Sequence, residues 1–164
     1  MKETLRSLSE FPDWLEITYS AFPDKLTNYC PISWEGIPSE HFTPIEHICH
    51  VRDIEVEGYQ VRFLRTLKEI NPTLTSIDGE TLARQRRYKD AVASEVLAAF
   101  RFARKQTVER IASMMEEELA RTAEFEEYGR VTMKGLIHLL CSHDQQHLAG
   151  LQWLLGKIAS HQAI

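Results

Sequence analysis

Apolar side chains recur every three or four residues in four stretches of the chain. The clearest stretch runs from Thr132 to about Ser160, and its apolar positions are Met133, Leu136, Ile137, Leu140, Leu148, Leu151, Leu154, Leu155 and Ile158. This spacing predicts an amphipathic helix that packs one face against a core. Less regular patterns of the same period predict helices over residues 3–21, 43–70 and 82–115. Because no run alternates apolar and polar residues as a strand does, we expect an all-α fold.

Turn and capping residues separate these stretches and favour a four-helix bundle. Thr43-Pro44-Ile45-Glu46 is a capping box with proline at the first helical position, which marks a helix start. Pro12 is compatible with a break or an early turn in the first helix. A short turn over Pro23–Leu26 is followed by a long connection, rich in turn residues over Cys30–Pro38, that leads to the second helix. With 164 residues and no internal repeat, the chain is expected to form one domain, residues 1–164.

Composition and charge narrow the functional classes. The net charge is −5, with 19 basic against 24 acidic residues, which argues against a nucleic-acid-binding protein. The densest basic run, Arg84 to Arg87, is short and is expected to form a solvated face. No segment approaches the roughly 20 apolar residues that span a bilayer, so we expect a soluble, cytoplasmic protein without a membrane partner. Three cysteines without C-x-x-C spacing favour free thiols.

Histidines on the predicted second and fourth helices are the candidate chemistry. His143 and His147 are four residues apart, so they lie on one helical face, in line with Leu140 and Leu151. Two buried imidazoles need partners for their nitrogens, and a metal ion satisfies both. His50 is an inward-facing histidine near the start of the second helix, and His47 is its rival as a third ligand. Such a pair alone is a weak signal, since buried histidines also occur as core polar residues.

Two segments around these histidines resemble the DinB-like (DinB/YfiT-type) family. The first runs from Phe42 to Asp53 and contains a capped helix with a glutamate followed four residues later by His50. The second runs from Gly129 to Leu148 and contains a glycine-hydrophobic-threonine entry and an H-[DE]-x-x-H-[LI] core. The resemblance implies a four-helix bundle with two long crossovers and one divalent metal on His50, His143 and His147. It also implies a homodimer, which exposed aromatic residues on the first helix would suit.

The family resemblance has one departure and leaves the reaction open. Family members often have glutamine three residues after the last histidine, where this chain has Gly150. That substitution removes any local hydrogen bond of the glutamine but does not affect the three histidines. Family members with known activity include thiol-dependent transferases, isomerases and hydrolases. A small-molecule substrate is therefore expected, with a low-molecular-weight thiol as one option.

Three histidines would leave a coordination position open for water or substrate, which favours a catalytic site over a structural one. A zinc-type ion lowers the pKa of bound water to about 7, and it can equally activate a thiolate. Imidazole ligands suit zinc and nickel, with iron as a further option. Asp144 and Glu46 are candidates to support the ligands without binding the ion. For Asp144 the helical geometry makes a direct bond to His143 awkward, and Glu46 is equally explained as the capping-box partner.

Two functional hypotheses follow. In the first, the chain is a metal-dependent transferase or hydrolase with an exchangeable ligand and a pocket that reaches the ion. In the second, it is a non-catalytic, stress-linked binding or scaffold bundle whose histidines are sealed from solvent and fix the helix register. DNA binding is suggested only by the family name, and the acidic balance argues against it.

Overall fold

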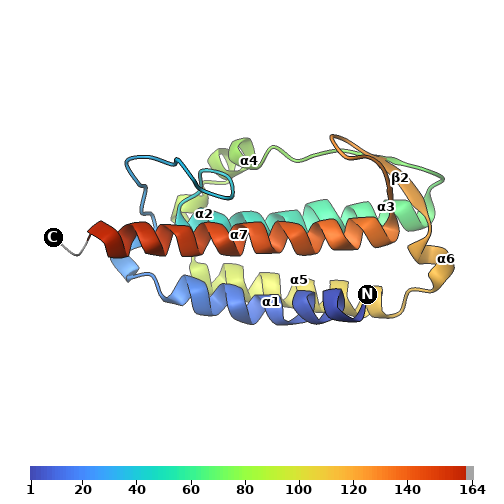
Figure 1. Ribbon diagram of the computed structural model, residues 1–164, viewed down its shortest axis with the longest axis horizontal. Coiled ribbons are helices and arrows are strands. Elements are labelled where there is room, and N and C mark those ends of the chain that lie inside the picture. Colours follow the sequence, from blue (N-terminus) through green and yellow to red (C-terminus); the bar gives the residue numbers. More distant parts are fainter. Residues whose placement is uncertain (162–164) are drawn as a thin grey trace.

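Four long helical segments form the body of the protein. The computed structural model describes residues 1–161, so residues 162–164 of the predicted domain lie outside the described residues. The segments are α1 (Lys2–Ser20), a continuous rod from α2 to α3, α5 (Ala93–Ala112) and α7 (Met133–His161). They run along one common direction, and α1 and the α2 end of the rod each pack against both α5 and α7 (Figure 1). The predicted four-helix bundle is confirmed.

The second rod consists of α2 (Pro44–Asp53), a π-helical segment η2 (Ile54–Tyr59) and α3 (Gln60–Lys68). Its predicted start is confirmed, because the backbone N–H and the hydroxyl of Thr43 both donate to Glu46 Oε2, at 2.9 and 2.8 Å. The wider turn of η2 was not predicted. It lies in the middle of the rod and includes Glu55, whose side chain is fully buried. π-Helical turns inside α-helices often occur at functional sites.

The prediction of one helix over residues 82–115 is wrong. This region contains α4 (Gly79–Gln85), a 3-10 turn η3 (Tyr88–Asp90) and α5. The chain reverses at Arg87, which has a positive φ of 52°. The reversal lets Tyr88 bury its ring and donate its hydroxyl to Asp53 Oδ2 at 2.6 Å. A tertiary contact with α2 therefore overrides the local helical pattern. Another 3-10 turn, η1 (Asp24–Leu26), follows α1.

A small sheet, which was not predicted, closes the end of the bundle opposite the start of α2 (Figure 1). Its strands are β1 (Thr73–Leu74), β2 (Thr122–Phe125) and β3 (Gly129–Thr132), in the order β1-β2-β3. β1 and β2 are parallel, with Leu74 opposite Phe125, whereas β2 and β3 are antiparallel. The short helix α6 (Glu116–Leu119) leads into β2.

Helix α1 continues through Pro12 without the break considered above. Proline has no N–H to donate to the carbonyl four residues earlier, which here is Leu8. The Leu8 carbonyl oxygen instead accepts a hydrogen bond from Arg104 Nη1 on α5, at 3.3 Å. A side chain of a neighbouring helix thus replaces the hydrogen bond that the proline removes.

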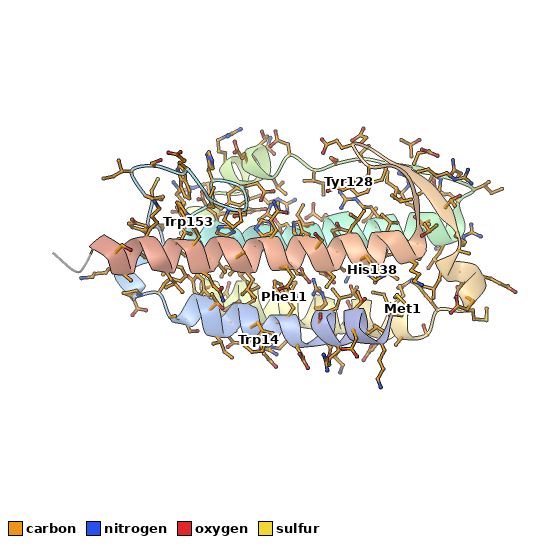
Figure 2. The ribbon with its side chains drawn as sticks, viewed as in Figure 1. Met1, Phe11, Trp14, Tyr128, His138 and Trp153 are labelled. Atoms are coloured by element: carbon orange, nitrogen blue, oxygen red, sulfur yellow. The ribbon has the colours of Figure 1, made fainter. Side chains whose placement is uncertain are left out.

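The outer surface of α1 carries exposed apolar side chains. Trp14 projects away from α7 and is 54 % exposed (Figure 2), and Ile17 and, on α5, Phe102 are also exposed. Among the described residues, no helix combines the length and apolar character needed to cross a membrane. The predicted homodimer stays a prediction, and these side chains would suit it.

Candidate metal centre

Three histidine nitrogens converge between α2 and α7. His50 lies on α2, whereas His143 and His147 lie one turn apart on α7. Nε2 of His143 is 3.2 Å from Nε2 of His50 and 3.1 Å from Nε2 of His147. One ligand nitrogen from each of the three residues lies within 4.8 Å of the others. The structure thus brings together the three residues that the sequence analysis named as ligands.

The protonation of these imidazoles suits a metal ligand set. Burial lowers the pKa of His50 to about 4 and lowers those of His143 and His147 well below the ordinary value. The rings are therefore neutral near pH 7, which is the form that binds metal ions. A neutral imidazole carries a single N–H, yet Nε2 of His143 faces two other ring nitrogens. A divalent cation at this point would be bound by all three nitrogens at once, so the donor set fits a metal.

His47 also contacts this cluster, but on the side of the His147 ring that is opposite to the converging nitrogens. Its Nδ1 lies 3.0 Å from Nδ1 of His147, the ring nitrogen that points away from the other two ligands. Burial, and to a lesser extent His50, lowers the pKa of His47 to about 3, so this ring is neutral and can accept a hydrogen bond. His50, rather than His47, contributes to the converging group. His47 is thus placed to orient His147.

Two glycines allow the backbone to approach these rings closely. A Cβ on Gly79 at the start of α4 would lie 2.5 Å from Cε1 of His50. A Cβ on Gly150 in α7 would lie 2.8 Å from Cε1 of His47 and would also meet Ser39 Oγ. The glutamine that family members often have at this position would occupy the same space. Because Gly150 has no side chain, the connection before α2 can pack closely against α7.

The two carboxylates proposed to support the ligands have other partners. Glu46 caps α2 through Thr43, as described above. Asp144 is buried and accepts two hydrogen bonds from Arg104, at 2.6 and 2.9 Å. Arg104 also donates to Glu55, at 3.1 and 2.9 Å. Burial raises the pKa of Asp144 to about 6, although Arg104 opposes this shift. Among the described residues, Asp144 is thus hydrogen-bonded to a guanidinium rather than to an imidazole.

Three further charged residues of this region, Glu40, Arg104 and Glu55, were not predicted from the sequence. Glu40 lies in the connection between α1 and α2, and its carboxylate oxygens are 3.5 Å from His147 Nε2 and 3.9 Å from His50 Nε2. A residue in an irregular connection has no periodicity that would indicate its partner. Arg104 and Glu55 lie on apolar helix faces, and a charged residue on such a face was the available signal.

The chain is similar to known proteins in both fold and sequence. The structure is similar to that of YfiT from Bacillus subtilis, with a TM-score of 0.84 and 18 % sequence identity over 96 % of this chain and 87 % of that chain. YfiT is described as a probable metal-dependent hydrolase with an unusual four-helix bundle topology. No curated protein sequence gives a significant match. The family model of the DinB superfamily matches residues 4–151, which is most of the chain, and the chain therefore belongs to the DinB superfamily.

Proposed function

We propose that this protein is a divalent-metal-dependent enzyme that acts on a small molecule, as a hydrolase or a thiol-dependent transferase. The convergence of three neutral imidazole nitrogens from two neighbouring helices carries this proposal. The ion would be zinc or nickel, with iron as a further option. The description of YfiT as a probable metal-dependent hydrolase supports the hydrolase alternative by analogy of fold.

The residues of the chain have separable tasks in such a reaction. His50, His143 and His147 would hold the ion through Nε2, and His47 would fix the ring orientation of His147. A bound divalent ion supplies Lewis-acid chemistry, which polarises a carbonyl or activates water or a thiolate as a nucleophile. The side chains of His147 and His50 are 0 and 3 % exposed, so they exclude water from the side of the core. Substrate would approach past Glu40, whose side chain is 38 % exposed.

Metal content tests the proposal first. Elemental analysis of the purified protein is expected to give one equivalent of zinc, nickel or iron, which is lost in His50→Ala and in His143→Ala. His138→Ala is the matched control, because His138 is an exposed histidine of the same helix α7. Loaded and metal-free protein would then be compared on esters and amides, with and without a low-molecular-weight thiol. Absence of metal after reconstitution with each ion would overturn the proposal.

The burial of the cluster favours a second candidate, a non-catalytic binding or scaffold bundle. In that case the histidines would serve the packing of α2 against α7, and any bound ion would be sealed. Binding of azide to the cobalt-loaded protein distinguishes the two functions. An enzyme with an exchangeable position is expected to change its visible absorption on azide binding, whereas a sealed site is expected to show no change.

A further inference from the structure

One carboxylate outside the predicted ligand set reaches the imidazole cluster. Glu40 places Oε2 3.5 Å from Nε2 of His147 and Oε1 3.9 Å from Nε2 of His50. These are the same nitrogens that converge with Nε2 of His143. The carboxylate therefore approaches the cluster on the side of His50 and His147, through the two nitrogens that lie beside Nε2 of His143, rather than at the back of a ring.

The spacing of these atoms matches that of ligands around one ion. Ligand bonds of about 2.0–2.1 Å place neighbouring ligand atoms about 2.9 Å apart in an octahedron and about 3.3 Å apart in a tetrahedron. In this structure the imidazole nitrogens are 3.1 and 3.2 Å apart, and Glu40 Oε2 is 3.5 Å from His147 Nε2. Glu40 Oε2 thus lies close to the separation from His147 that is expected for an additional ligand, whereas Oε1 is 3.9 Å from His50 Nε2, which is longer.

Glu40 Oε2 lacks a hydrogen-bond partner within the described part of the chain, although this atom is buried. Leaving a buried carboxylate oxygen without a donor is costly. A cation among the four side chains would give Glu40 Oε2 a positively charged partner.

The connection that carries Glu40 is held against α7 by several contacts. The ring of Trp34 stacks on Trp153 of α7, with centroids 6.3 Å apart, and on His41, with centroids 5.2 Å apart. Trp153 lies on the side of α7 where this connection passes (Figure 2). The backbone N–H of Phe42 donates to the Glu40 carbonyl oxygen at 2.8 Å. Gly150 leaves the space into which Ser39 packs. The backbone therefore fixes the position from which the carboxylate reaches the cluster.

We propose that Glu40 is a fourth protein ligand to the ion held by His50, His143 and His147, an inference that rests on the proposed metal function. Four protein ligands would close a tetrahedral zinc site, whereas a six-coordinate ion keeps positions for water and substrate. A catalytic centre with this ligand set therefore favours nickel or iron over zinc. The carboxylate also lowers the net positive charge of the bound ion from the side on which substrate approaches.

The test uses the cobalt-loaded protein, whose visible absorption bands report coordination number and donor type. Glu40→Gln is expected to change these bands and to weaken cobalt binding by about tenfold or more in competition with a chelator. Glu35→Gln is the matched control, because Glu35 is an exposed glutamate of the same connection. Adding acetate to Glu40→Gly is expected to restore the wild-type bands, since acetate supplies the missing carboxylate. Unfolding of the metal-free variants checks that the fold is retained.

Three results would overturn the inference, and they are distinguishable. Unchanged bands and affinity in Glu40→Gln would show that the carboxylate does not contribute. Weaker binding with unchanged bands would show that Glu40 acts from outside the coordination sphere. Wild-type protein that binds no cobalt, nickel, iron or zinc would overturn the proposed function itself, and this inference with it.

Discussion

At the scale of single residues, the contact between His47 and His147 determines how one ligand is presented. When Nε2 of His147 faces the other ligands, its Nδ1 carries the proton and can donate to Nδ1 of His47, 3.0 Å away. Such contacts to the far nitrogen of a metal-binding histidine fix the ring and raise its basicity. His47 is thereby a positioning residue that the capped start of α2 brings to the cluster.

Replacement of His47 by phenylalanine is expected to weaken metal binding by about tenfold to a hundredfold, because the acceptor for His147 is lost while the ring volume is kept. His47→Asn is expected to retain more affinity, since its side-chain oxygen can occupy the place of Nδ1. Chelator competition measures both, and His138→Phe on the surface of α7 is the control. Equal affinities for wild-type protein and His47→Phe would contradict the positioning role.

The residues that the sequence predicted well are those whose signals are local. His143 and His147 follow the apolar line of one helix, and His50 follows a capping box by a fixed number of residues. Glu40 has no such signal, because the fold of a long connection brings it to α7. The three cysteines are free, as expected, and Cys49 is fully buried.

At the scale of elements, two glycines of α7 provide a matched pair. Gly150 faces Ser39 and His47, whereas a Cβ on Gly156 would meet nothing within 4 Å. Gly156→Ala is expected to stabilise the protein by about 0.5–1 kcal/mol, because alanine favours helix more than glycine does. Gly150→Ala is expected to destabilise it by about 1–3 kcal/mol through overpacking. Urea unfolding measures both, and a stabilising Gly150→Ala would show that the connection before α2 does not rest on α7.

The hydrogen bonds that Asp53 of α2 makes with residues in and beside the 3-10 turn η3 predict that the protein is less stable in acid. Asp53 accepts hydrogen bonds from Arg52 Nε, Arg86 Nη1 and Tyr88 Oη, at 2.6, 2.7 and 2.6 Å. Burial alone would raise the pKa of Asp53, but these hydrogen bonds outweigh it and lower the pKa below its ordinary value of 3.8. The stabilisation is therefore present above pH 3.8 and is lost as pH falls through the lower folded-state pKa.

Asp53→Asn is expected to lower the free energy of unfolding by about 1–3 kcal/mol at neutral pH. The difference from wild-type protein should shrink below pH 3.8, where the wild-type carboxylate also becomes protonated. Asp90→Asn removes an exposed aspartate that pairs with Arg87 in the same turn, and it is expected to change stability by less than about 1 kcal/mol. Denaturant unfolding at several pH values measures these effects. A pH-independent difference would contradict the role of the ionised Asp53.

The individual elements show why some parts of the fold could be predicted from the sequence and others could not. The start of α2 depends on residues three apart, so its boundary was predicted correctly. The break between α4 and α5 depends on Tyr88 reaching Asp53, 35 residues earlier, and helical periodicity carries no trace of that contact. The strands have only two to four residues each, too few for an alternating pattern to emerge.

At the scale of the whole molecule, Arg104 of α5 connects all four rods of the bundle. Its guanidinium donates to the Leu8 carbonyl oxygen of α1, to Glu55 in the π-helical turn of the second rod and to Asp144 of α7. It also lies against the ring of Phe100, 4.9 Å from the centroid. The side chains of Arg104, Glu55 and Asp144 are at most 1 % exposed. Two carboxylates and one cation are thus buried together next to His143.

Arg104→Met is expected to destabilise the metal-free protein by about 3–5 kcal/mol, because it keeps the apolar volume but leaves both carboxylates buried without a cation. Adding Glu55→Gln and Asp144→Asn to this variant should recover much of the loss, since the uncompensated charges disappear. Arg101→Met is the matched control, because Arg101 lies on the same helix and pairs with Asp13 and Glu16 while it remains exposed. Its expected effect is about 0–1 kcal/mol. If the two arginine variants were equally stable, or if the triple variant were no more stable than Arg104→Met, the bundle would not depend on this buried charge cluster.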